Sequence, residues 1–99
     1  MVKHIVLWSF NQNLDEEEKS RAATRIKREL EALPALIPEI VSMHVATELF
    51  GTCNSELALV STFKNKADLR TYIDHPEHKR VGQFVRSVVT DRKSADFEY

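Results

Sequence analysis

The segment that decides the fold is Val2–Phe10, VKHIVLWSF, at the start of the chain. In a strand, alternate side chains point to opposite faces. One face then carries Val2, His4, Val6, Trp8 and Phe10, and the other carries Lys3, Ile5, Leu7 and Ser9. Both faces hold large apolar side chains, which is not typical of a strand with one side in water. The segment therefore predicts a strand in a sheet that is covered on both sides.

The first helix is predicted from a cap and an apolar stripe. Asp15 followed by Glu18 is the pattern of a capping box, in which side chains satisfy the free N–H groups of the first turn. Apolar residues then recur at helical spacing, and Pro34 ends the helix because it lacks a backbone N–H. The stripe consists of Ala22, Ile26, Leu30 and Leu33.

The rest of the chain predicts a hairpin, two short helices and a last strand. Residues 39–49 and 55–63 are rich in β-branched and aliphatic side chains, and a short turn with Gly51 joins them. Residues 66–74 predict a helix, and Pro76 can begin another because it suits the first helical turn. The last strand is expected within 88–99.

The predicted order is βαββαβ, which is typical of the α+β class. Right-handed crossovers place the helices on one face of a four-stranded antiparallel sheet, the ferredoxin-like arrangement. The other face would leave Ile5, Leu7, Ala58 and Val60 in water, and an exposed apolar patch of this kind marks an interface. We therefore expect a homodimer in which two sheets pack face to face as a dimeric α/β barrel.

Composition narrows the classes of function. The chain has 99 residues, so we expect one domain over 1–99. Fourteen basic and 15 acidic residues give a net charge of −1, which argues against a nucleic-acid or membrane partner. A single cysteine excludes an intrachain disulfide, and two isolated glycines do not make a phosphate-binding loop. No signal-peptide pattern precedes the first strand, which predicts a cytoplasmic protein.

The segment Tyr72–His78, YIDHPEH, is the candidate site. It places a phenol and two imidazoles at the join of two helices, and His4 adds another imidazole to the first strand. Such groups exchange protons near neutral pH. For His4 alone, a hydrogen-bonded core histidine is the simpler interpretation, and the ring of His75 is expected to cap the following helix. A zinc site of His4, His75 and His78 is a minor alternative without the HExxH pattern.

Several segments together resemble the stress-responsive α/β-barrel (Dabb) domain family. The most specific is Tyr72-x-x-His75-Pro76-x-His78, and the others are Val2–Trp8, Ile37-Pro38, Leu57–Phe63 and Asp96-Phe97. The resemblance implies a dimeric α/β barrel with a pocket between sheet and helices. A plant cyclase of this family closes a linear polyketide by aldol condensation. In that cyclase the tyrosine and second histidine of the motif act on the substrate, and the strand-one histidine lines the pocket. The resemblance thus implies catalytic roles for Tyr72, His78 and His4.

The same resemblance implies a lining for the pocket, with two departures from the cyclase. We expect a substrate-binding lining of Val6, Trp8, Ile26, Met43, Leu57, Leu59 and Asp96. Asp96 is also the expected partner of His78. The cyclase has a further histidine where this chain has Leu57, and aromatic residues where this chain has Ala22, Ala23 and Ile26. The pocket is therefore expected to have a different shape, which makes the cyclase's own substrate a poor fit.

Three functions remain open on the sequence. The first is a homodimer that binds a small apolar or aromatic molecule without catalysis. The second is a cyclase or lyase that needs no cofactor, in which His78 removes a proton and Tyr72 stabilises the resulting oxyanion. The third is a small-barrel monooxygenase, because one fold can serve several activities. No cofactor and no metal is predicted.

Overall fold

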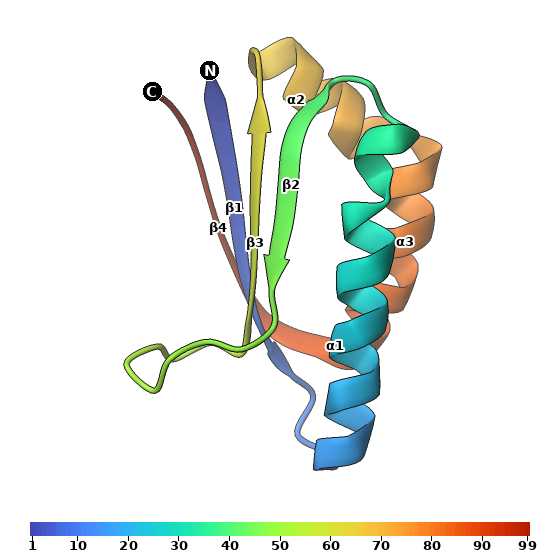
Figure 1. Ribbon diagram of the computed structural model, residues 1–99, viewed down its shortest axis with the longest axis vertical. Coiled ribbons are helices and arrows are strands. Elements are labelled where there is room, and N and C mark those ends of the chain that lie inside the picture. The colour runs from blue at the N-terminus through green and yellow to red at the C-terminus, as the bar shows by residue number, and fades with distance from the viewer.

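The computed structural model describes residues 1–99 and has a ferredoxin-like fold (Figure 1). The elements in chain order are β1 (Val2–Phe10), α1 (Glu16–Glu31), a 3-10 turn η1 (Leu33–Ala35), β2 (Ile40–Ala46), β3 (Leu57–Phe63), α2 (Lys66–Asp74), α3 (Pro76–Val88) and β4 (Val89–Glu98). The antiparallel sheet has the strand order β2-β3-β1-β4. The predicted class and element order are confirmed.

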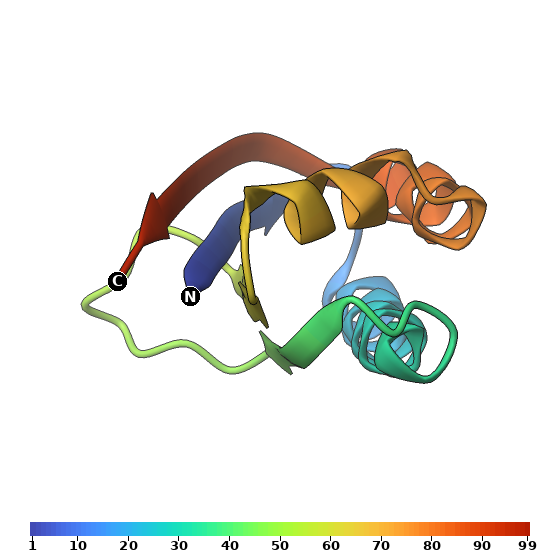
Figure 2. The ribbon, with the colours of Figure 1, turned by 90° about the horizontal axis from the view of Figure 1, so that it is seen from above.

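Strand β1 lies in the middle of the sheet, between β3 and β4. Its alternation is as predicted: Val2, His4, Val6, Trp8 and Phe10 are buried, and the residues between them are half-buried. Helices α1 and α3 lie on one side of the sheet, and the loop between β2 and β3 projects on the other side (Figures 1 and 2). The apolar core therefore lies between the sheet and the helices.

Strand β4 contains a bulge next to the site described below. Its pairing with β1 shifts between Leu7 and Ser9, where β4 holds one extra residue. Asp91 has φ of 56°, a left-handed conformation that aspartate tolerates better than most residues. Before the shift, Ser94 lies opposite the buried Val6. Alternation then places Arg92 on the helix side of the sheet, two residues from Ser94.

Local hydrogen bonds explain where the helices begin. The side chain of Asp15 accepts a bond of 2.8 Å from the N–H of Glu18, and the Glu18 carboxylate accepts one of 3.1 Å from the N–H of Asp15. This confirms the capping box. His75 Nδ1 accepts a bond of 3.1 Å from the N–H of Glu77, and Pro76 is the first residue of α3. The predicted capping role of His75 is confirmed.

The hairpin between β2 and β3 is less tight than expected. Strand β2 ends at Ala46 and β3 begins at Leu57, so residues 47–56 form a long connection. The register of β2 with β3 runs only as far as Ala46 opposite Ala58, and the N–H of Glu56 donates to the carbonyl oxygen of Trp8 in β1. The predicted strand ends at 49 and 55 are therefore wrong. On β2, His44 lies at the surface, with its Nδ1 3.3 Å from Glu31 Oε2 and its side chain 68% exposed.

No helix combines the length and the apolar character needed to cross a membrane.

Candidate functional site

A cavity of about 270 Å³ lies between the middle of the sheet and the helices. Six elements contribute to it, and its lining is mostly apolar with a cluster of polar rings and two guanidinium groups. The lining residues are His4, Val6, Trp8, Leu30, Leu59, Tyr72, His78, Gly82, Val85, Arg86 and Arg92. The structure thus brings His4, Tyr72 and His78 together on one cavity.

Tyr72 is the central side chain of this cluster. Its ring centroid lies 6.0 Å from that of His4 and 4.3 Å from that of His78. The phenol is buried, which raises the pKa of Tyr72 well above its ordinary value, although the charge of Arg92 acts in the opposite direction. The Tyr72 hydroxyl therefore keeps its proton and can donate a hydrogen bond near neutral pH.

His78 is held in its neutral form. Burial lowers the pKa of its imidazole, and a hydrogen bond to the carbonyl oxygen of Ile73 partly opposes this effect. The charges of Arg86 and Arg92 lower this pKa further. His78 Nδ1 lies 3.1 Å from the Ile73 oxygen, and only a protonated nitrogen can bond to a carbonyl. In the neutral ring, Nε2 therefore carries the lone pair and can accept a proton.

His4 pairs with Asp96, and this corrects the expected partner of His78. Asp96 lies directly opposite His4 in the β1–β4 ladder, so both side chains point to the same side of the sheet. His4 Nδ1 makes a short hydrogen bond to Asp96 Oδ1. The imidazole is buried, whereas the Asp96 side chain is 45% exposed. The carboxylate thus fixes the orientation of the His4 ring.

The predicted lining is found in part. Val6, Trp8 and Leu59 line the cavity. Ile26 and Leu57 are fully buried in the core instead. Met43 packs on the core from β2, which forms the sheet edge opposite β4. Asp96 faces a neighbouring hollow with Val2, Leu69 and Phe97, and it contacts the site only through His4.

Sequence reasoning missed both arginines of the lining. His78, Gly82 and Arg86 are spaced four residues apart, which places them on one face of α3. With His78 as a candidate, this spacing could have predicted that Arg86 lies on the same helix face. The position of Arg92 at the cavity depends on the register of β4 with β1, and no local sequence pattern predicts that register.

The histidines of the metal alternative do not form a ligand set. No group of three or more histidine, cysteine, aspartate or glutamate side chains is placed to hold a metal ion. The ring of His75 accepts a hydrogen bond from the N–H of Glu77, and Nδ1 of His78 is hydrogen-bonded to the carbonyl oxygen of Ile73. These residues therefore give no support to a zinc site.

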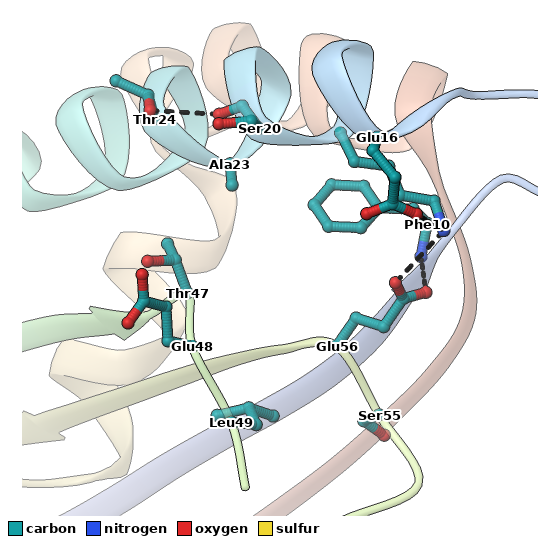
Figure 3. A pocket seen from close by; sticks show the side chains of 11 residues that line it. Phe10, Glu16, Ser20, Ala23, Thr24, Thr47, Glu48, Leu49, Ser55 and Glu56 are labelled. Atoms are coloured by element: carbon teal, nitrogen blue, oxygen red, sulfur yellow. Dashed lines mark hydrogen bonds and ion pairs between the residues drawn. The ribbon is translucent and has the colours of Figure 1, made fainter. Parts of the chain in front are cut away.

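A second hollow, of about 530 Å³, lies near the end of β1 and contains none of the predicted site residues. Its lining is largely polar (Figure 3). Glu56 accepts a bond of 3.0 Å from the N–H of Phe10 and lies 3.4 Å from Lys19 Nζ. The carboxylate therefore fastens the start of β3 to the end of β1 and to α1.

Solved structures with the same fold include proteins of different description. A dimeric protein of unknown function with a ferredoxin-like fold from Bacteroides fragilis is 34% identical, with a TM-score of 0.92, over 99% of this chain and 95% of that chain. A hydroxynitrile lyase from Passiflora edulis is 18% identical, with a TM-score of 0.80, over 97% of this chain and 90% of that chain. An antibiotic biosynthesis monooxygenase is 12% identical, with a TM-score of 0.76, over 100% of this chain and 98% of that chain. The last two likenesses show the fold alone.

No curated protein matches this sequence. The model of one family, however, matches residues 2–99, and it describes the stress-responsive A/B barrel domain, or Dabb domain. The family that the Tyr72–His78 motif and the strand patterns indicated is thus confirmed over nearly the whole chain. The chain belongs to the stress-responsive A/B barrel (Dabb) domain family.

Proposed function

We propose that this protein binds a small organic molecule in the His4–Tyr72–His78 cavity and that it works as a cytoplasmic homodimer. The observation that carries the proposal is the composition of the cavity wall. Polar rings of His4, Tyr72 and His78 face the same space as the apolar side chains of Val6 and Trp8. Ligand sites typically combine an apolar wall with a few convergent polar groups. The lining therefore suits a compact apolar or aromatic molecule with one polar end.

The face of the sheet that points away from the helices supports the dimer. Ile5 lies opposite Val60 and Leu7 opposite Ala58 in the central strands, and all four side chains are half-buried. Phe97 on β4 is 47% exposed. A contiguous apolar patch of this kind favours association. The relative from Bacteroides fragilis is described as dimeric.

Imidazole NMR tests the binding proposal with internal controls. The protein has four histidines: His4 and His78 line the cavity, whereas His44 and His75 do not. We expect ¹H–¹⁵N signals of His4 and His78 to shift when small aromatic compounds are added, while those of His44 and His75 stay in place. Shifts confined to His44 or His75 would place the ligand elsewhere and contradict the proposal.

Acid–base chemistry in the same cavity is a second candidate function. It is favoured by one observation: the rings of His78 and Tyr72 lie 4.3 Å apart, and burial lowers the pKa of His78 while it raises the pKa of Tyr72. His78 Nε2 would take a proton from the carbon next to a carbonyl group. The electron pair of that C–H bond would pass to the carbonyl oxygen as an enolate, and the Tyr72 hydroxyl would donate a hydrogen bond to that oxygen.

The fold is compatible with this chemistry, since the Passiflora edulis protein of the same fold is described as a hydroxynitrile lyase. That likeness is in the fold and does not identify a substrate here. The monooxygenase alternative rests on a likeness of the same kind, and no arrangement of side chains in the cavity favours it.

A further inference from the structure

We infer that the ligand of the cavity is a small organic acid, whose anionic group lies at Arg86 and Arg92 while its apolar part packs on Trp8 and Val6. This inference rests on the proposed binding function and specifies the class of ligand. Four observations support it: the charge of the lining, the unpaired arginines, the space at Gly82 and the size of the cavity.

The charge of the lining is positive. The eleven lining residues include two arginines and no aspartate or glutamate. Asp96 approaches the site only through the ring of His4, so its charge is already committed to that imidazole. A cavity with cationic groups and no carboxylate of its own is complementary to an anion.

Neither arginine has a carboxylate partner. No ion pair in the protein includes Arg86 or Arg92. The only side-chain hydrogen bond of Arg92 is a long one of 3.4 Å to Ser94 Oγ. A guanidinium carries five N–H donors in a planar fork that fits a carboxylate in two parallel bonds. These two groups thus have free donors at the edge of the cavity.

Gly82 makes room for one of these groups. A Cβ atom built on Gly82 would lie 3.0 Å from Arg86 Nη1 and 3.7 Å from its Cζ. The guanidinium therefore lies directly over the backbone of Gly82, one helical turn back toward His78. A side chain at position 82 would require the Arg86 guanidinium to shift, so the absence of a Cβ there leaves this group its present place above α3.

The positive charge also acts on His78. Besides burial, the guanidinium groups of Arg86 and Arg92 contribute to the lowered pKa of its imidazole. An anion bound between the arginines would offset this repulsion.

The size of the site limits the choice of acid. Its volume of about 270 Å³ lies just below the usual range of ligand cavities, roughly 300–1,000 Å³. A single ring or a short chain with one acid group fits this description.

The test compares acids with amides of the same shape. Benzoate and benzamide form one matched pair, and hexanoate and hexanamide form another. Trp8 is the only tryptophan and lines the cavity, so its fluorescence reports binding, and calorimetry measures affinity independently. We expect at least one acid to bind about tenfold more tightly than its amide, because a hydrogen bond between two charged groups is stronger than one between a charged and a neutral group. That preference should weaken as salt is raised.

Variants of the two arginines test whether these side chains cause the preference for acids over amides. Arg86→Gln and Arg92→Gln should each reduce the affinity for the acid about tenfold and leave the affinity for the amide unchanged. Lys79→Gln is the matched control, because Lys79 is an exposed cation of α3 outside the cavity lining, and it should leave both affinities unchanged.

Two outcomes would overturn the inference in distinguishable ways. One outcome is that acid and amide bind with equal affinity and both still change the fluorescence of Trp8 and the NMR signals of His78. This result would contradict the anion preference and would still support the cavity as the binding site. Absence of binding by both members of both pairs would overturn the inference and count against the proposed binding function as well.

Discussion

At the scale of single residues, the Tyr72 hydroxyl and the Tyr72 ring have separate roles. The ring packs against Phe63, with centroids 5.2 Å apart, and belongs to the core. The hydroxyl donates the hydrogen bond to the enolate oxygen in the proposed chemistry. In an enzyme of this kind, Tyr72→Phe should lower turnover about a hundredfold, the usual effect of removing one donor to an oxyanion. The melting temperature should change little because the ring remains. Unchanged turnover of the variant would exclude this role.

His78 is the only cavity residue to which we assign the role of base. His78→Ala should abolish exchange of solvent deuterium into the carbon next to the carbonyl of a bound ketone or aldehyde, followed by NMR. His44→Ala is the control, because His44 is exposed and lies outside the cavity. Undiminished exchange in His78→Ala would show that His78 is not the base.

The lowered pKa of His78 makes stability depend on pH. A histidine in the unfolded chain has a pKa of about 6.5, and folding lowers it here. As pH falls below 6.5, the unfolded state binds the proton first, and the free energy of unfolding decreases. Between pH 7.5 and 5, urea denaturation should show a larger loss of stability for the parent than for His78→Asn. His44→Asn should follow the parent. Parallel curves for the parent and His78→Asn would contradict a depressed pKa.

The candidate residues could be predicted from the sequence, but their partners could not. Alternation in the first strand placed His4 on the helix side, and the resemblance indicated Tyr72 and His78. Asp96 was assigned to His78, whereas the β1–β4 register gives it to His4. Such pairings depend on contacts between residues far apart in the chain, which local patterns do not contain.

At the scale of elements, α3 presents His78, Gly82 and Arg86 on one face, and Gly82 links its stability to the site. Gly82→Ala should stabilise the helix by up to about 1 kcal/mol, because glycine is the poorer helix former. The same change should move the Arg86 guanidinium, whose Nη1 lies 3.0 Å from the new Cβ position. We therefore expect a higher urea midpoint together with weaker binding of the acid. A higher midpoint with unchanged acid binding would show that the position of Arg86 is unimportant.

The ends of helices were predicted better than the ends of strands. The start of α1 and the join of α2 and α3 are set by Asp15, His75 and Pro76, whose bonds are local. Next to the start of β3, Glu56 bonds to Trp8 and Phe10, which belong to the first strand. A sequence window does not show such contacts between distant segments.

At the scale of the whole molecule, the uncovered face of the sheet should hold two copies together. Leu7 lies in the central strand on that face, opposite Ala58 and Lys93. Leu7→Glu should give a monomer or an unfolded chain, because burying an unpaired charge is strongly unfavourable. Light scattering at micromolar concentration measures the mass. Gln83→Glu, an exposed change on α3, is the control and should stay dimeric. A monomeric parent protein would contradict the barrel dimer.

A crystal structure of the protein soaked with benzoate or hexanoate tests directly whether an organic acid binds in the His4–Tyr72–His78 cavity. We expect density for the acid in the cavity of about 270 Å³, with its apolar part against Trp8 and its carboxylate at Arg86 or Arg92. Density only in the polar hollow beside Glu56, or only on the outer face of the sheet, would contradict it.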